Sequence, residues 1–220
     1  MKLDLTISET EDKLFRILYS DVRRRILREV NAANMSPSLI ECLLILYFKF
    51  LVANGHRFKY MTGKQLANLY HIYFNMPDFD FIEEIISYIN PTVRNGLSAE
   101  GFIKLVEIWA FSNLEQKMKF CFAIYTYRDP RGVITRNRLK KLCRNMIYME
   151  SLEDSYDLLN EYVDIVLRKM DVDRDGIISY RDYESIVTRN PRLLEFAGRV
   201  MPDITRLYET IGDMKQTSIT

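Results

Sequence analysis

The feature that most constrains the fold of this chain is a dipeptide, one apolar residue followed by one hydroxyl residue, that recurs four times. Successive copies lie 36, 37 and 44 residues apart. Each hydroxyl residue precedes a segment with apolar residues at helical spacing, and Ser and Thr are favoured caps of helix starts. A repeat of this length is typical of a duplicated helix–loop–helix unit. The sequence therefore predicts four such units, with joints at Met61-Thr62, Leu97-Ser98, Ile134-Thr135 and Ile178-Ser179.

Helical periodicity dominates the rest of the chain, and no long strand pattern is present. Three hydroxyl residues are followed three positions later by Glu or Gln, which is the capping-box pattern of a helix start. These pairs are Ser8 with Glu11, Thr62 with Gln65, and Ser112 with Glu115. We expect an all-α chain with helices over about 9–30, 36–54, 62–75, 77–90, 98–109, 113–125, 136–149, 153–170 and 180–189.

The repeats predict two lobes, each made of two helix–loop–helix units with short paired β contacts between their loops. A chain of 220 residues is long enough for two small cores. We place an N-terminal helix in residues 1–35, a first pair of units in 36–111, a second pair in 112–190 and a helical tail in 191–220.

Charge and hydropathy argue against nucleic-acid and membrane partners. The net charge is +1, so no global field attracts nucleic acid. The longest apolar run, over residues 39–53, is too short to span a bilayer and contains Glu41 and Lys49. Residue 2 is Lys2 rather than the glycine that N-myristoylation requires. We expect a cytoplasmic protein without a membrane anchor, whose partner is another protein.

The stretch DVDRDGIISYRD, over residues 171–182, has the ligand pattern of a calcium-binding EF-hand loop. Calcium prefers six to eight oxygen ligands, which such a loop supplies from positions 1, 3, 5, 7, 9 and 12. Gly176 occupies position 6, where the chain must turn sharply. The predicted metal ligands are therefore Asp171, Asp173, Asp175, the backbone carbonyl of Ile177, Ser179 and Asp182.

Position 12 of this loop departs from the usual pattern. It usually carries a glutamate that binds calcium through both oxygens, whereas Asp182 is one methylene shorter. The prediction is a weakened calcium site, or a six-coordinate site that tolerates magnesium. Ile178, at position 8, is expected to pair with Ile134 in the neighbouring loop.

The other three loops lack the ligands for a divalent ion. The third retains only Asp129, and none of the three has an acid at position 1, 5 or 12. We expect all three to be empty. The residues at those positions are Asn54, Phe58 and Gln65 in the first loop, Asn90, Arg94 and Gly101 in the second, and Tyr127, Arg131 and Arg138 in the third.

Nothing in the sequence predicts an enzyme. His56 and His71 have no nucleophile or carboxylate at a useful spacing, and no phosphate loop, HExxH or CxxC motif occurs. The three cysteines, Cys42, Cys121 and Cys143, stand in apolar helical patterns and have no histidine base nearby. We expect them to be buried free thiols, and we expect no catalysis.

Two further patterns each have two interpretations. A basic run from Arg128 to Arg144 precedes an acidic run from Glu150 to Asp164, so either the two attract each other within the lobe or the basic face binds an acidic partner. Aromatic and Met residues at helical spacing are expected in the core rather than in an open target groove. These are Phe120, Phe122, Tyr125, Met146, Met149, Met170 and Tyr183.

Three segments resemble calaxin-like EF-hand proteins, which are related to the neuronal calcium sensors. They are NLEQKMKFCFAIY with RGVITRNRLKKL, YVDIVLRKMDVDRDGIISYRDYE, and LLEFAGRVMPD. The resemblance covers roughly residues 36–203 and is strongest after residue 112. Such proteins normally carry ligands in the second and third hands too. Because this chain does not, only the fourth-loop residues inherit a ligand role.

The resemblance implies a calcium-binding regulatory protein associated with outer dynein arms and their docking complex in cilia and sperm flagella. Coiled coils of dynein or of the docking complex are the partners it implies. Two alternatives stay open on the sequence alone. One is a structural EF-hand adaptor with a constitutive ion, and the other is a calcineurin-B-like or sensor-type regulatory subunit.

Overall fold

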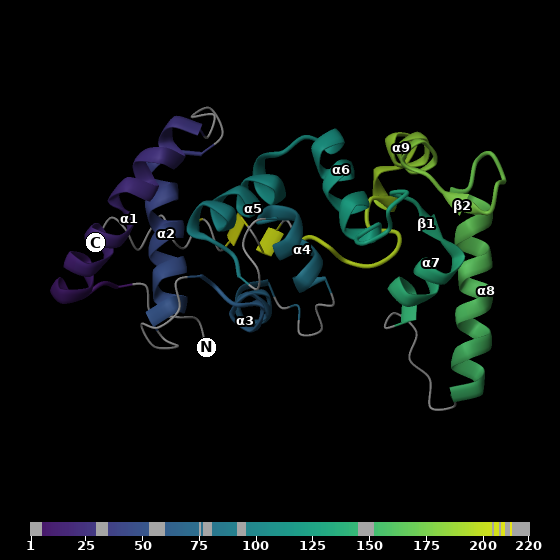
Figure 1. The fold of residues 1–220 in the computed structure, drawn as a ribbon, viewed down its shortest axis with the longest axis horizontal. Coiled ribbons are helices and arrows are strands. Elements are labelled where there is room, and N and C mark those ends of the chain that lie inside the picture. The colour runs from purple at the N-terminus through teal and green to yellow at the C-terminus, as the bar shows by residue number, and fades with distance from the viewer. Residues whose placement is uncertain are drawn as a thin grey trace. The chain divides into compact units, whose positions relative to one another are not determined.

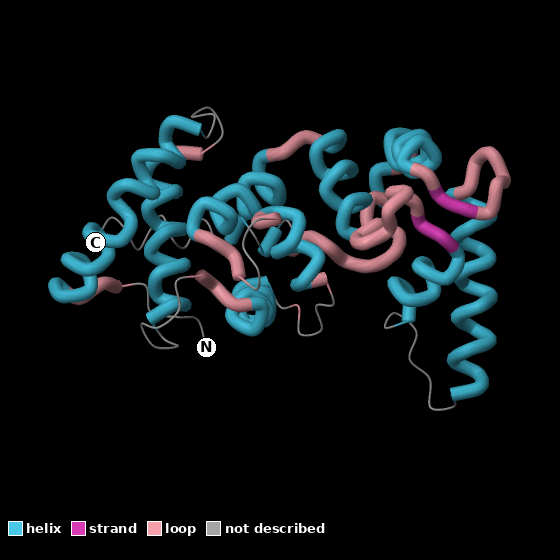
Figure 2. The backbone as a smooth tube through the Cα atoms, viewed as in Figure 1, coloured by secondary structure: helices cyan, strands magenta, loops and turns pink. Residues whose placement is uncertain are grey.

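The computed structural model describes residues 6–29, 35–52, 60–74, 76, 81–91, 96–144, 152–203, 205, 206, 208, 209 and 212. Helices joined by loops make up the fold, with one small sheet, so the predicted all-α class is confirmed (Figures 1 and 2). The elements are α1 (Glu9–Glu29), α2 (Pro37–Val52), α3 (Gly63–Phe74), α4 (Ile82–Ile89), α5 (Ala99–Phe111), α6 (Leu114–Tyr125), β1 (Ile134–Thr135), α7 (Arg136–Cys143), α8 (Leu152–Met170), β2 (Ile177–Ile178), α9 (Tyr180–Arg189) and the 3-10 helix η2 (Pro191–Leu193).

The chain divides into two compact units. Unit 1 comprises Met1–Ser112 together with Met201–Thr220, and unit 2 comprises Asn113–Val200. Each unit contains two successive joints of the repeat, and each is described separately below.

In unit 1 the first two joints pair through a single β-bridge between Met61 and Leu97. Each of these residues donates its N–H to the other's carbonyl, at 2.9 and 2.8 Å. The hydroxyl of Tyr47, from α2, accepts the N–H of Met61 at 3.1 Å and donates to the carbonyl of Leu97 at 2.7 Å. Since Tyr47 is 1% exposed, this hydroxyl ties both joints to the core.

In unit 2 the last two joints form the antiparallel sheet of β1 and β2, drawn in magenta in Figure 2. Ile134 pairs with Ile178, as the sequence predicts, and Thr135 pairs with Ile177. Both isoleucines at the first pair are fully buried. The sheet therefore joins the third and fourth loops, including the loop that carries the predicted metal ligands.

The predicted core of unit 2 is confirmed wherever the structure describes it. The aromatic and Met residues singled out from the sequence are buried rather than lining an open groove, except that Met146 and Met149 lie outside the described residues. The buried ones are Phe120, Phe122, Tyr125, Met170 and Tyr183. Burial raises the pKa of the Tyr125 and Tyr183 hydroxyls, which donate to the carbonyls of Gly198 and Leu194.

Two of the three predicted capping boxes are confirmed, at Ser8 with Glu11 and at Thr62 with Gln65. The third prediction is wrong by one residue. Helix α6 is capped by Asn113, whose side chain accepts the N–H of Gln116 at 2.9 Å while the Gln116 side chain accepts the N–H of Asn113 at 3.1 Å. Ser112 is used differently, because it ends α5 and donates its hydroxyl to the carbonyl of Glu107.

The three cysteines are buried free thiols, as expected. Burial raises the pKa of Cys143 to about 11, so this thiol stays protonated near neutral pH. Among the described residues, no helix combines the length and the apolar character needed to cross a membrane. The predicted start of the fourth helix at Pro77-Asp78 lies outside the described residues, and α4 is described from Ile82.

Candidate metal centre

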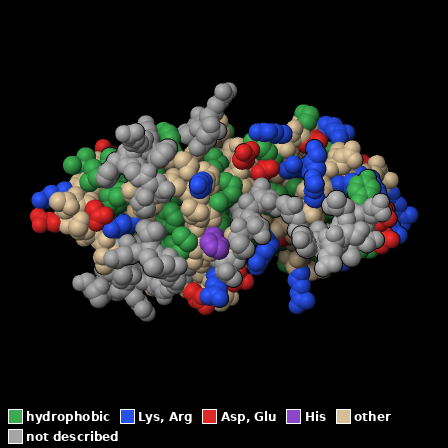
Figure 3. Space-filling model, turned by 90° about the horizontal axis from the view of Figure 1, so that it is seen from below, with side chains coloured by type: hydrophobic (Ala, Val, Ile, Leu, Met, Phe, Trp, Pro, Cys, Tyr) green, Lys and Arg blue, Asp and Glu red, His purple; other side chains and the backbone are tan. Residues whose placement is uncertain are grey.

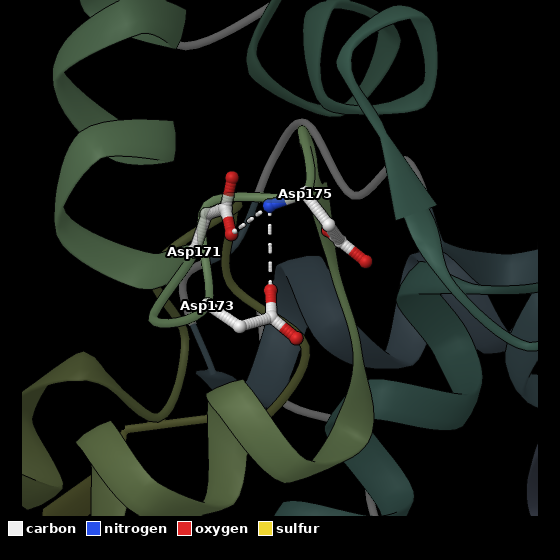
Figure 4. Close-up of side chains that lie close together, drawn as sticks. All are labelled: Asp171, Asp173 and Asp175. Carbon is white, nitrogen blue, oxygen red and sulfur yellow. Dashed lines mark hydrogen bonds between the residues drawn. The ribbon is translucent and has the colours of Figure 1, made fainter.

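The fourth loop connects the end of α8 at Met170 to β2 and α9 in unit 2. Three of its carboxylates, those of Asp171, Asp173 and Asp175, converge so that one oxygen from each lies within 4.8 Å of the others (Figure 4). Carboxylate oxygens grouped in this way are the hard ligands that calcium and magnesium require. The side chains at positions 1, 3 and 5 are therefore brought together as the sequence predicts for a metal loop.

Backbone N–H groups hold the carboxylates in place. The N–H of Asp175 donates to an oxygen of Asp171 at 3.2 Å and to one of Asp173 at 3.4 Å, the two dashed lines of Figure 4. The N–H of Gly176 donates to the second oxygen of Asp171 at 2.9 Å, and the N–H of Ile177 donates to Asp175 at 3.0 Å. Hydrogen bonds within the loop therefore fix the positions of these three carboxylates without an ion.

Position 6 needs glycine because of its backbone dihedral angle, and not because a side chain would clash with neighbouring atoms. Gly176 has a φ of +86°, in the left-handed region that side chains disfavour, while an added Cβ would meet no atom within 4 Å. Arg174, at position 4, has a φ of 62° despite carrying a side chain. Two left-handed residues in one short loop produce the turn that aims the three carboxylates inward.

The grouped acids destabilise one another in the absence of a counter-charge. Loss of hydration raises the pKa of the Asp173 carboxyl, and the negative charge of Asp175 adds to this effect, followed by that of Asp182 and Asp171. A raised carboxyl pKa means that the ionised form is disfavoured where it stands. A divalent cation would remove this repulsion, so the donor set fits calcium or magnesium.

Position 12 is arranged differently from positions 1, 3 and 5. Asp182 is 5% exposed and is not one of the three converging carboxylates. One of its oxygens accepts the N–H of Val172 at 3.3 Å, while the other accepts the N–H and the hydroxyl of Ser179 at 2.9 and 2.5 Å. Asp182 and Ser179 together form the capping box of α9. Ligation by these two residues, and by the carbonyl of Ile177 in β2, stays a prediction.

The third loop contains a cation of its own at position 12. The guanidinium of Arg138, in α7, donates from Nε to the carbonyl of Tyr125 at 2.7 Å and from an Nη to that of Ile124 at 3.3 Å. These carbonyls belong to the last turn of α6, where carbonyls have no N–H donor four residues later within the helix. The remaining acid, Asp129, accepts the N–H of Arg131 at 2.9 Å. Arg138 therefore links the two helices of this hand without a metal.

Position 12 carries no acid in the first two loops either. Gln65 donates to the carbonyl of Phe50, in the last turn of α2, at 2.9 Å. Gly101 has no room for a ligand, since an added Cβ would lie 2.6 Å from the side-chain amide of Asn90 and 3.0 Å from a Leu97 methyl. The other predictions for these loops concern residues outside the described part of the chain, namely Asn54, Phe58 and Arg94.

The role of position 12 as a link between helices was not predicted from the sequence. The available signal was the residue type, because Gln65 and Arg138 carry N–H donors and no carboxylate where a calcium loop needs an anionic acceptor. The acceptors they contact, Phe50 and Tyr125, lie 15 and 13 residues away along the chain. Only the packing of the helix pair brings these groups together.

Comparison with known proteins agrees with this geometry. The chain is 28% identical to calaxin of Danio rerio over 192 residues, which cover 86% of the chain and 90% of the relative. It is 27% identical to calaxin of Homo sapiens, covering 79% and 83% of the two chains. It is also 33% identical to calcineurin B of Schizosaccharomyces pombe, over 47% of the chain and 58% of that protein. No family model matches the chain. The fold, the fourth loop and these relatives together support a calaxin-like EF-hand protein.

Proposed function

We propose that this chain is a calcium-binding regulatory protein of the calaxin type, located in the axoneme of cilia or flagella. In this proposal it attaches to the outer dynein arm or to coiled coils of its docking complex, and ion binding to the fourth loop controls the attachment. The observation that carries the proposal is the convergence of the carboxylates of Asp171, Asp173 and Asp175. The similarity to calaxin over most of the chain supports the choice of partner.

The fourth loop alone supplies the regulation. Asp171, Asp173 and Asp175 bind the ion directly, and the carbonyl of Ile177, Ser179 and Asp182 complete its oxygen shell. Reaching the ion requires Asp182 to exchange its hydrogen bonds with Val172 and Ser179 for a metal contact. This exchange weakens calcium binding and allows magnesium to compete. We expect no catalytic activity.

A structural adaptor with a permanent ion is the second candidate. Arg138 and Gln65 link the helices of their hands at position 12 without a metal, and Gly101 has no side chain to offer as a ligand. In a fold held together in this way, the only role of calcium is to stabilise the fourth loop. A sensor-type regulatory subunit similar to calcineurin B has less support, because that relative matches only 47% of this chain.

Calorimetric titration of calcium, with physiological magnesium present, tests the metal site. We expect one calcium per chain, loss of binding in Asp171→Ala, and tighter binding in Asp182→Glu, because the longer side chain reaches the ion with both oxygens. Asp157→Ala is the control, since Asp157 is an exposed acid of α8 outside the loop. Unchanged calcium binding in Asp171→Ala would refute the site.

Attachment to isolated axonemes separates the two candidate functions. If the chain is a sensor, calcium changes the amount that cosediments with axonemes, and Asp171→Ala removes that response. If attachment is the same with calcium, with chelator and in Asp171→Ala, the adaptor with a structural ion is correct and the regulatory proposal fails.

A further inference from the structure

Exposed apolar side chains are concentrated on one helix of unit 2. Of the eight large apolar side chains that stand exposed in the described part of the chain, four fall within residues 156–172. The exposed position of Tyr156 is explained by a cation–π contact, since the Lys140 ammonium lies 5.6 Å from the centre of its ring. The other three, Leu158, Ile165 and Val172, are 43%, 55% and 53% exposed and have no such explanation.

We call these three residues, which recur every seven positions, the apolar line. Leu158 and Ile165 are seven residues apart in α8, about two helical turns, so both point to the same side. Val172 follows after the same interval, just beyond the helix end at Met170. Leu158 and Ile165 are about 10 Å apart along the helix axis at the rise of an α-helix. Apolar residues seven positions apart lie on one stripe of a helix surface, which a second helix can contact.

The opposite side of α8 is already occupied. Val163, Val166 and Met170 are 0%, 8% and 1% exposed and pack into the core of unit 2. Burial of that side fixes the orientation of the helix, and Leu158 and Ile165 are consequently held toward solvent. Val172 is exposed in the loop that follows. An apolar face that the fold itself presents in this way is typical of a protein interaction site.

Charged side chains surround the middle of the line. A cleft of about 950 Å³ is lined by Ile165 and by three arginines and three acids, namely Arg136, Arg168, Arg174, Glu161, Asp164 and Asp171. Figure 3 shows basic side chains in blue and acidic side chains in red on one face of the molecule. Arg136 and Asp164 form an ion pair with each other. Arg168 and Arg174 make no ion pair within the described part of the chain.

We propose that the α8 face, made of Leu158, Ile165 and Val172 with Arg168 and Arg174, binds an acidic amphipathic helix of a protein partner. We further infer that ion binding to the fourth loop strengthens this contact. The inference rests on the proposed function, because the ion changes the charge balance of the face. Leucine-like side chains of the partner cover the apolar line, and its carboxylates pair with the two arginines.

Asp171 connects the ion to the partner. Its carboxylate belongs to the metal-binding group and also lines the cleft beside Arg168 and Arg174. Without an ion, the charges of the loop acids offset the two arginines. A bound divalent cation cancels the charge of Asp171, which leaves the arginines in excess and attracts an acidic helix. The effect requires no rearrangement of the helices.

A second connection runs through the backbone. The N–H of Val172, at the end of the apolar line, donates to Asp182. If Asp182 turns toward the ion, this hydrogen bond is released and Val172 is free to adjust to the partner. The α8 face and the metal loop are thus connected through the Asp171 side chain and through the N–H of Val172.

Two synthetic peptides of about three heptads test the proposal on the full chain. Both carry leucines at the seam positions, and one has glutamates at the flanking positions where the other has lysines. Fluorescence anisotropy is measured with calcium and with chelator. We expect the glutamate peptide to bind with calcium, and its affinity to fall on the order of tenfold in Ile165→Ser and in Arg168→Gln. Ile17→Ser is the control, since Ile17 is 77% exposed on α1 of unit 1.

Three outcomes overturn the inference. One is equal binding of both peptides, another is no effect of Ile165→Ser, and the third is equal binding of an unstructured polyglutamate, which would mean that charge alone is recognised. Calcium titration on the same sample separates the two proposals. If calcium binds but the glutamate peptide does not, the α8 face is wrong and the metal site stands. If no calcium binds, the proposed function fails first.

Discussion

At the scale of single residues, position 12 decides what each hand can do. Asp182 offers acceptors, and its carboxylate caps α9 beside the three converging acids. Arg138 and Gln65 offer donors, which satisfy carbonyls of the preceding helix. Gly101 has no side chain that could donate or accept, and the Asn90 side chain occupies the adjacent space. Positions 1 and 5 of the other three loops also lack acids, so position 12 is one of several differences from the fourth loop.

Replacement of Arg138 tests this role. Arg138→Gln removes charged hydrogen bonds to Tyr125 and Ile124, so we expect the free energy of unfolding to fall by about 1–2 kcal/mol. Lys141→Gln is the control, because Lys141 is an exposed residue of the same helix, and it should change stability by less than about 0.5 kcal/mol. Chemical denaturation in the presence of chelator measures both. Equal stabilities of the two variants would mean that Arg138 does not hold the hand together.

At the scale of elements, each pair of hands is joined by a minimal β contact between its loops. In unit 2 it is the pairing of β1 with β2, which includes the loop of the metal centre. In unit 1 it is the single bridge of Met61 and Leu97, which the Tyr47 hydroxyl reinforces. Burial raises the pKa of Tyr47, so this hydroxyl keeps its proton and can donate to Leu97.

Removal of this one hydroxyl tests the bridge. Tyr47→Phe keeps the ring but leaves the Leu97 carbonyl and the Met61 N–H each without one partner in a buried place, so we expect a loss of about 1–3 kcal/mol in stability. Tyr208→Phe is a suitable control, because the Tyr208 hydroxyl donates to the Ala110 carbonyl from a ring that is 51% exposed. In thermal unfolding, the midpoint temperature of Tyr47→Phe should be well below that of the control. The reverse order would contradict the bridging role.

At the scale of the whole molecule, the predicted metal ligands all lie in unit 2. Asp171, Asp173 and Asp175 lie in unit 2, and the described position-12 residues of unit 1 carry no acid. A ligand stabilises the part of a protein that binds it, by an amount that grows with its concentration relative to the dissociation constant. Calcium should therefore act on the two units unequally.

Calorimetry can measure this inequality. At calcium concentrations 100 times the dissociation constant, the unfolding transition of unit 2 should gain about 2.7 kcal/mol, while that of unit 1 stays where it is. Chelator, or Asp171→Ala in the presence of calcium, should return the unit 2 transition to its metal-free temperature. A single transition that shifts as a whole would show that the units unfold together, and a shift confined to unit 1 would contradict the assignment of the site.

The sequence by itself determined the local features of this protein. Helical spacing predicted the helices, the repeated joints predicted the pairing of Ile134 with Ile178, and the alternating acids of the fourth loop predicted which carboxylates converge. These features succeed because each depends on residues close together in the chain, or on a repeat that can be aligned. The shifted cap at Asn113 shows the limit, since two overlapping capping patterns compete there and only packing decides between them.

The tertiary structure alone decided how the hands without a metal are held and which surface stays open. The contacts of Arg138 with Tyr125, of Gln65 with Phe50, and of the Tyr47 hydroxyl with two joints all span many residues of the chain. The exposure of Ile165 follows from the burial of the opposite side of α8. A sequence pattern states which groups can donate or accept, but the packing of helices determines which of them meet.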